Sequence, residues 1–215
     1  PLARPPRVVI DCGNGAGALV APALFDKLLP DAKCLYCESD GTFPNHHPDP
    51  TVVDNLRPLI AEVTRGGYDF GVAFDGDADR IGVVDSTGQI IWGDYLLILY
   101  ARDVLARTGK GQPIIFDVKC SQALPEAVAR AGGRPVMWKT GHSLIKGKMK
   151  ELGAPIAGEM SGHMFFAESF YGHDDAVYAA ARLVRIVSEA GQPIEGLLAD
   201  VPRFVSTPEI RIDCP

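Results

Sequence analysis

The sequence predicts an α/β protein built from two consecutive βαβαβ-type domains, with mixed, mostly parallel sheets covered by helices. Short apolar runs, typical of buried strands, alternate with longer amphipathic segments, typical of helices. The same alternation occurs in both halves of the 215 residues. Because a helix between two strands normally returns the chain to a parallel neighbour, each half is expected to form a largely parallel, helix-covered sheet.

The first domain is predicted to span residues 1–92. Pro58 is expected to make its second helix irregular, since proline cannot donate a backbone hydrogen bond. The pattern predicts strands at 7–11, 33–37 and 69–74, helices at 18–29 and 52–65, and a hairpin of strands 81–85 and 89–92.

The second domain is predicted to span residues 93–205, and residues 206–215 are expected to begin a strand or linker into a further domain. The predicted N-caps are Asp94, Ser121 and either Asp174 or Asp175. Strands are expected at 114–118, 135–138, 154–158 and 163–167, and helices at 94–107, 121–131, 144–152 and from 174 or 175 to near 191.

The composition excludes several classes of function. With 21 Lys and Arg against 27 Asp and Glu, the formal net charge is −6, which argues against binding nucleic acid or an anionic membrane surface. The sequence contains no apolar stretch long enough to cross a bilayer, and no signal-peptide pattern opens the chain. We expect a cytoplasmic protein that is a monomer.

Five cysteines, an odd number, are scattered over expected strands and loops. Cys34 and Cys37 form a C-x-x-C pattern, but both lie in the expected strand 33–37. Residues three apart on a strand face opposite ways, so buried free thiols are the favoured interpretation.

The stretch FDGDADR places Asp75, Asp77 and Asp79 on alternate residues directly after the predicted strand 69–74. Alternate residues of an extended segment point the same way, so the three carboxylates are expected to converge. Like charges at that distance repel one another unless a cation lies between them, and carboxylate oxygens favour Mg²⁺. The prediction is a magnesium site, followed by Arg80, whose fixed charge suits a phosphate or one of the carboxylates.

The same loop has other interpretations. A solvated acidic turn that caps the strand would need no ligand. An EF-hand is excluded, because its sixth and twelfth places hold Arg80 and Ser86 instead of Gly and Glu. A phosphatase with Asp75 as covalent nucleophile remains, although Asp79 stands where such an enzyme would have Thr or Val.

The stretch GEMSGH predicts a sugar-binding loop. Glu159, Ser161 and His163 alternate after an apolar strand, and in an extended loop they would share one face. A carboxylate, a hydroxyl and an imidazole suit the hydroxyls of a sugar ring, which both donate and accept hydrogen bonds. Gly158 and Gly162 would allow a ligand to approach closely.

Polar and basic residues follow two predicted strands of the second domain, at the ends where ligands bind in parallel sheets. With Arg80, the basic members are expected to form a positive patch for a phosphorylated sugar, the alternative being solvated lysines at strand ends. Lys146 and Lys148 are expected on an exposed helix face, without a role in binding. The residues at the strand ends are Lys119, Lys139, Thr140, Gly141 and His142.

The stretch DCGNGAG fits a dinucleotide-binding pattern. Gly13, Gly15 and Ala18 follow G-x-G-x-x-A between a predicted strand and helix, and Glu38 lies where a ribose-binding acid is expected. This interpretation leaves the three aspartates unexplained, and a tight turn into a helix accounts for the same glycines. The alternative functions are therefore a nicotinamide-dependent oxidoreductase and a non-catalytic sugar-phosphate-binding module.

Four motifs, in order, resemble the α-D-phosphohexomutase family of phosphomannomutases and phosphoglucomutases. FDGDADR is similar to its metal-binding loop and GEMSGH to its sugar-binding loop, while FPNHHPDP at 43–50 and KTGHSLIK at 139–146 also match. The resemblance covers nearly the whole chain and is closest to the bacterial enzymes that accept both glucose and mannose phosphates.

The resemblance implies a mutase that interconverts hexose 1-phosphate and 6-phosphate through a phosphoserine and a bisphosphate intermediate. Mg²⁺ would bind to the three aspartates, and Arg80 would stabilise charge on the moving phosphoryl group. The glutamate and serine of GEMSGH would hold the sugar. His163 would serve as general acid or base, with Lys119 and His142 beside it. The segment 43–50, with its two adjacent histidines, would shape the cleft without direct chemistry.

Two features of that family are absent from the sequence. The 215 residues contain no phosphoserine loop of the TASHNP type and no final phosphate-binding loop rich in Arg, Ser and Thr. The family is built from three such α/β domains and a smaller fourth one, so the resemblance implies partner domains on both sides of this chain. We therefore expect the chain by itself to fold, to bind metal weakly and to have no mutase turnover.

Overall fold

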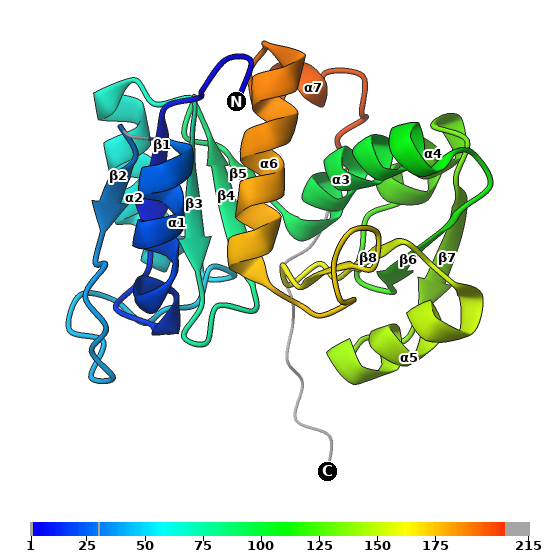
Figure 1. The fold of residues 1–215 in the computed structure, drawn as a ribbon, viewed down its shortest axis with the longest axis horizontal. Coiled ribbons are helices and arrows are strands. Elements are labelled where there is room, and N and C mark those ends of the chain that lie inside the picture. The colour runs from blue at the N-terminus through cyan, green and yellow to red at the C-terminus, as the bar shows by residue number, and fades with distance from the viewer. Residues whose placement is uncertain (1, 30, 205–215) are drawn as a thin grey trace.

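A computed structural model describes residues 2–29 and 31–204 and shows two α/β units side by side (Figure 1). The predicted fold class is confirmed. One sheet has the strand order β2-β1-β3-β4-β5, and the other has the order β7-β6-β8-β9. In each sheet one inner strand, β1 or β6, has two parallel neighbours, and the sheet continues on one side through antiparallel pairs.

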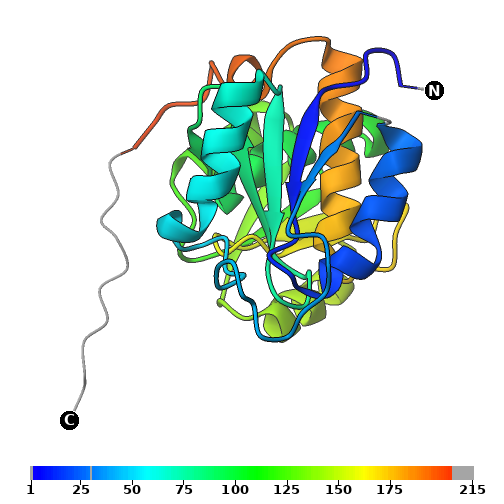
Figure 2. The ribbon, with the colours of Figure 1, turned by 90° about the vertical axis from the view of Figure 1, so that its left-hand side faces the viewer.

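The first unit has its sheet between helices. Helix α2 covers one face, and α1 covers the other together with α6 of the second unit (Figure 2). The predicted helix 18–29 is interrupted at Val20 and restarts with Pro22 in the first turn, where the missing N–H of proline is tolerated. The elements are β1 (Val8–Asp11), the 3₁₀ helix η1 (Ala16–Leu19), α1 (Ala21–Leu28), β2 (Lys33–Leu35), α2 (Val53–Gly66), β3 (Phe70–Phe74), β4 (Ile81–Asp85) and β5 (Ile90–Ile91).

The second unit repeats the theme. Asp175 caps α6 by accepting a hydrogen bond from the Tyr178 amide (2.8 Å), whereas α3 begins one residue before Asp94, so that predicted cap is wrong. The expected strand at the chain end lies outside the described residues. The elements are α3 (Gly93–Thr108), β6 (Pro113–Asp117), α4 (Ala123–Arg130), β7 (Arg134–Trp138), α5 (His142–Leu152), β8 (Ile156–Gly158), β9 (Met164–Phe166), α6 (Ala176–Ala190) and a short, unpredicted α7 (Ile194–Leu197).

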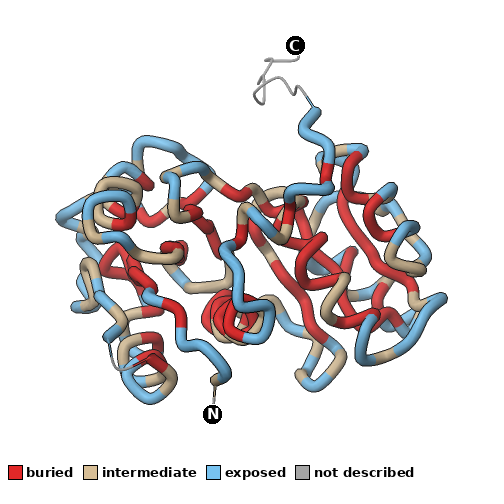
Figure 3. Tube along the Cα trace, turned by 90° about the horizontal axis from the view of Figure 1, so that it is seen from above, coloured by how far each residue is buried: buried red, intermediate tan, exposed pale blue. Residues whose placement is uncertain are grey.

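One hydrophobic core joins the two units. It contains buried side chains from β1, β3 and β4 of the first sheet, from β6, β8 and β9 of the second, and from α3 and α6 between them. Figure 3 shows the buried residues continuing across the join. Helix α6 follows β9 in the chain, yet it packs on β3 and β4. Among the described residues, each helix is too short or too polar to cross a membrane.

The cysteines differ from the prediction. Cys34 and Cys37 form a disulfide, with Cα atoms 6.0 Å apart. The expected strand 33–37 ends at Leu35, and Tyr36 takes a positive φ of 52°, so the chain turns and brings Cys37 back to Cys34. Cys12 remains a buried free thiol, with its Sγ 3.3 Å from that of Cys37.

Candidate functional site

The three aspartates predicted to bind metal come together after β3. Asp75, Asp77 and Asp79 each present an oxygen within 4.8 Å of the others. The backbone is a turn and is not extended as predicted, because the Ala78 amide donates to the Asp75 carbonyl (3.1 Å) and Ala78 has a φ of 63°. A tight turn, and not the alternation of a strand, therefore makes the carboxylates converge.

Asp75 anchors this loop. It is 2% exposed, and its Oδ1 accepts hydrogen bonds from the amides of Asp79 and Arg80, both at 3.0 Å. Its Oδ2 accepts from Arg80 Nε (2.6 Å), while Arg80 Nη1 lies 3.3 Å from Asp49. Two carboxylates thus fix the guanidinium beside the aspartate cluster.

The electrostatics of the cluster fit a cation. Burial, with the neighbouring carboxylate of Asp75, raises the pKa of Asp79 to about 6. The protein disfavours a third negative charge there because like charges lie close together. The three converging ligands are carboxylate oxygens, the set that Mg²⁺ prefers. The residues present therefore fit the metal that the sequence predicts.

The predicted sugar loop also converges through a turn. The Gly162 amide donates to the Glu159 carbonyl (3.0 Å), so the loop is not extended as predicted. His163 Nδ1 lies 2.9 Å from Glu159 Oε2 and 3.0 Å from Ser161 Oγ. Burial raises the pKa of Glu159, but hydrogen bonds from His163 and the Gly141 amide outweigh it, and the net shift is downward.

The two loops meet across the join between the units. His163 Nε2 lies 3.2 Å from Asp79 Oδ1, and the Ile81 amide donates to the Gly162 carbonyl (3.1 Å). Gly162 has a φ of 102°, and a Cβ there would collide with the Ile81 carbonyl oxygen. We expected Gly162 to admit a ligand, but it admits the backbone of the metal loop.

His163 lies between two carboxylates, those of Glu159 and Asp79. Burial lowers its pKa, but the hydrogen bond to Glu159 and the charges of Asp79 and Glu159 raise it more, so the net shift is upward. His142 stacks on His163 with ring centroids 6.0 Å apart, and its Nδ1 lies 3.7 Å from Asp174 Oδ2. Two stacked imidazoles, with a carboxylate at either end, therefore cross the site.

The two helix lysines are less exposed than predicted. Lys146 Nζ donates to Asp174 Oδ1 (2.9 Å), which places its ammonium at the edge of the site. The Lys148 side chain is 14% exposed and lies over the Trp138 ring at 4.3 Å. Both lysines are partly covered because α5 packs against the sheet, and a helix position alone does not reveal this.

Two basic residues of the predicted positive patch lie beside His163. Arg80 pairs with His163 across a backbone bridge, and His142 stacks on the same ring. Lys119 and Lys139 are exposed at the carboxyl ends of β6 and β7.

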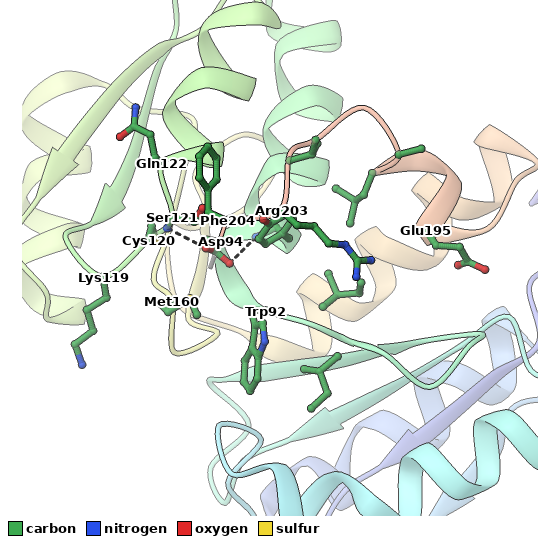
Figure 4. Close-up of a pocket in the computed structure, with 16 residues that line it drawn as sticks. Trp92, Asp94, Lys119, Cys120, Ser121, Gln122, Met160, Glu195, Arg203 and Phe204 are labelled. Atoms are coloured by element: carbon green, nitrogen blue, oxygen red, sulfur yellow. Dashed lines mark hydrogen bonds between the residues drawn. The ribbon is translucent and has the colours of Figure 1, made fainter. Parts of the chain in front are cut away.

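Lys119 also lines a pocket of about 860 Å³ that contains none of the three metal-loop aspartates. In Figure 4 its amine points away from Asp94, which accepts a hydrogen bond from the Ser121 amide (2.9 Å). This pocket lies next to Met160 of the sugar loop.

Sequence reasoning missed several carboxylates that organise the site. Asp174 holds Lys146, and Asp49 holds Arg80. Asp11 and Asp117 are 1% and 0% exposed, and each is the last residue of a central strand. An acid at the carboxyl end of an apolar strand is the signal that would have found the last two.

The geometry of the glycine-rich loop disfavours a dinucleotide site. The Ala16 amide donates to the Gly76 carbonyl (2.8 Å), and a Cβ at Gly15 would lie 2.8 Å from the same oxygen. The segment that follows is a short 3₁₀ helix, η1, with no N-terminus of an α-helix for a pyrophosphate. The glycines allow this loop to pack behind the metal loop, so the dinucleotide interpretation is not favoured.

His46 attaches the segment 43–50 to the first sheet. Its Nε2 lies 3.1 Å from Asp11 Oδ2, and its Nδ1 lies 3.0 Å from the His47 carbonyl oxygen. With an oxygen at each ring nitrogen, the doubly protonated imidazolium is favoured. The bond to Asp11 raises the pKa of His46, although burial opposes the shift.

We predict that His46→Gln lowers stability in a pH-dependent way. A raised folded-state pKa gives a stabilisation that is complete below the unfolded-state value of about 6.5 and is lost as the pH rises through the folded-state pKa. The variant should lose about 1–3 kcal/mol at pH 6, because buried Asp11 loses its positively charged partner, and less at pH 9. Thermal unfolding across this range measures the difference. His47→Gln, at the exposed neighbouring residue, is the control, and a difference that did not change with pH would contradict the prediction.

Comparison with known proteins places the chain in a family. Residues 2–88 match the family description phosphoglucomutase/phosphomannomutase, alpha/beta/alpha domain II, and residues 92–204 match domain III. A phosphomannomutase/phosphoglucomutase from Pseudomonas putida is 55% identical over 212 residues, which is 99% of this chain and 46% of that protein. A phosphoglucomutase from Neisseria gonorrhoeae is 49% identical over 214 residues, 100% of this chain and 46% of that protein.

A solved structure agrees with these relatives. The crystal structure of a phosphoglucomutase/phosphomannomutase family protein from Burkholderia thailandensis superposes with a TM-score of 0.91 at 48% identity. It covers 96% of this chain, which corresponds to 45% of that one. The chain thus spans about half the length of the relatives it matches. The chain belongs to the phosphoglucomutase/phosphomannomutase family and corresponds to its alpha/beta/alpha domains II and III.

Proposed function

We propose that this chain forms the metal-binding and sugar-binding part of a Mg²⁺-dependent phosphohexomutase. The reaction would interconvert the 1-phosphate and 6-phosphate of glucose or mannose through a phosphoserine and a bisphosphate intermediate. One observation carries the proposal: the aspartate loop and the GEMSGH loop come from different units and meet at the contact of 3.2 Å between Asp79 and His163. A phosphate held at one loop would therefore lie next to a sugar held at the other.

The residues have distinct roles in this proposal. Arg80 is fixed by Asp75 and Asp49, so its remaining N–H groups face a phosphoryl group without having to reorganise. Ser161 offers a hydroxyl to the sugar. Glu159 Oε1 already accepts a hydrogen bond from the Gly141 amide, and Oε2 lies beside His163. The remaining lone pairs of both oxygens would accept hydrogen bonds from sugar hydroxyls.

Protons would move through the imidazoles. The side chain of His142 is 53% exposed, which makes it the accessible base for a sugar hydroxyl, while His163 behind it is held between Glu159 and Asp79. Lys119 would contribute positive charge from the end of β6. Mg²⁺ held by Asp75, Asp77 and Asp79 would supply the positive charge that polarises a phosphoryl oxygen.

An NMR titration tests the proposal. Mg²⁺ is expected to shift the amides of residues 75–80, and glucose 1-phosphate those of residues 158–163. Glucose and inorganic phosphate, added separately, are the control ligands and should bind more weakly. Ser161→Ala should weaken binding of glucose 1-phosphate and leave the amide shifts caused by Mg²⁺ unchanged. Shifts at Gly13 and Gly15 on addition of NAD, without response in the two loops, would overturn the proposal.

Turnover is a separate expectation. The 215 residues contain no phosphoserine loop of the TASHNP type, so the chain by itself is expected to show no conversion of glucose 1-phosphate to the 6-phosphate. A coupled assay measures this, with the Asp75→Asn variant as control for contaminating enzyme. Conversion by the chain that disappears in the variant would contradict the expectation.

A further inference from the structure

A buried carboxylate lies beneath the sugar loop and outside the predicted site. Asp117 is the last residue of β6 and is 0% exposed. Strand β6 is central, with β7 and β8 as parallel neighbours. The loops that follow these three strands carry Lys119, then Thr140 to His142, then Glu159 to His163. Asp117 is therefore at the point where all three loops leave the sheet.

The side chain of Asp117 holds each of these loops by one hydrogen bond. Its Oδ2 accepts from Thr140 Oγ1 (2.9 Å), and its Oδ1 accepts from the Met160 amide and from Cys120 Sγ, both at 3.1 Å. Burial raises the pKa of Cys120, so its thiol stays protonated and can donate. A carboxylate only accepts, so it can satisfy three donors that approach from different loops.

Met160 is the residue between Glu159 and Ser161, which links Asp117 to the proposed sugar contacts. The loops are also tied to one another: the Gly141 amide donates to Glu159 Oε1 (2.6 Å). A shift of Thr140 would therefore move the donor that fixes the Glu159 carboxylate.

The first unit contains the same device. Asp11 is the last residue of β1, the strand between β2 and β3, and is 1% exposed. It accepts from the Gly13 amide (2.9 Å) in the loop after its own strand, and it pairs with His46 in the loop after β2. A buried acid at the end of the strand with two parallel neighbours thus ties neighbouring loops in both sheets, although the loop sequences differ.

We propose that Asp117 is a positioning residue for sugar-phosphate binding, which fixes the loops after β6, β7 and β8 in one arrangement. The proposal rests on the proposed function for its ligand, but the loop arrangement can be measured without one. Asp117 touches neither the sugar nor the phosphate, and it acts through Thr140, Met160 and Cys120.

Asp117→Ala is expected to weaken binding of glucose 1-phosphate by about 10–100-fold, the cost of a misplacement of about 1 Å. Binding of Mg²⁺ should change by less than about 2-fold, because Asp75 and Arg80 form their loop without Asp117. Asp117→Asn should restore sugar-phosphate binding to within about 3-fold, since its amide can donate to Thr140 Oγ1, whose hydroxyl can rotate to accept.

Asp85→Ala is the matched control. Asp85 is also 0% exposed and ends a strand, and its Oδ1 accepts three hydrogen bonds, from the Thr87 amide and hydroxyl and the Gln89 amide. Its loop lies in the β4–β5 hairpin, so Asp85→Ala should lower the stability of the fold without weakening the binding of glucose 1-phosphate. If both variants weakened glucose 1-phosphate binding equally, Asp117 would contribute only to general stability, and the proposal would be overturned.

Hydrogen exchange distinguishes this proposal from the proposed function. In Asp117→Ala, exchange of the Gly141 and Gly162 amides should accelerate at least about 10-fold, although neither is bonded to Asp117. If the wild-type chain gave no response to glucose 1-phosphate, the proposed function would fail. The exchange rates would still test the positioning role of Asp117, because they need no ligand. Unchanged rates would overturn the positioning role. Should Asp117→Ala not fold, Thr140→Val detaches the β7 loop alone and should accelerate Gly141 but not Gly162.

Discussion

Asp77→Asn is expected to remove most of the Mg²⁺ affinity while leaving the fold intact. Asp77 is the exposed member of the aspartate cluster, so its replacement disturbs little packing, whereas Asp75 also holds Arg80. Loss of a direct ligand should weaken Mg²⁺ binding by at least about 100-fold, the most that loss of an outer-shell partner typically costs. Isothermal titration calorimetry measures the change in dissociation constant.

Thermal unfolding gives a second readout with opposite signs in the two conditions. Without Mg²⁺, the variant should unfold at a slightly higher temperature than wild type, because the charge of Asp77 repels Asp79. At Mg²⁺ 100-fold above the wild-type dissociation constant, wild type should gain about 2.7 kcal/mol and the variant only about 0.4 kcal/mol. Asp54→Asn, at an exposed position of α2, is the control. A variant with the full wild-type gain would exclude Asp77 as a ligand.

Phe166→Ala is expected to be the most destabilising single change in the shared core. Phe166 is 0% exposed on β9, with ring centroids 5.0 Å from Tyr100 and 5.3 Å from Tyr178, and the Arg182 guanidinium 4.6 Å above it. Removing the ring leaves a cavity and should cost about 3–5 kcal/mol. For a chain of this size the unfolding midpoint should fall by roughly 6–20 °C.

Phe165→Ala is the matched control on the opposite face of the same strand. Phe165 is also 0% exposed, but it belongs to a separate cluster with α5. The two variants should be similarly destabilised. Only Phe166→Ala should shift the amide signals of residues 70–72 in β3, because its core continues through α6 to β3 and β4. Shifts confined to the second unit in both variants would show that the shared core does not couple the units.

The alternation of strands and helices could be predicted because it depends on local periodicity. Strand β3 contains five consecutive buried residues, and α6 ends at Gly191 with a φ of 63°, the left-handed cap that glycine favours. Prediction failed where a single residue changed the chain direction: Tyr36 ended β2 early and so allowed the disulfide of Cys34 and Cys37.

The residue types and spacing of FDGDADR and GEMSGH by themselves predicted which side chains gather at the candidate site, since three close carboxylates repel one another unless a cation lies between them. Only the tertiary structure decided how those side chains meet. The contact of Asp79 with His163 joins residues from different sheets, and Asp117 reaches loops that follow three different strands. Such contacts depend on sheet order and on the packing of α6 between the units, which are long-range properties. Local sequence patterns report only on neighbours along the chain, so they specify the chemistry of each loop but not its partners.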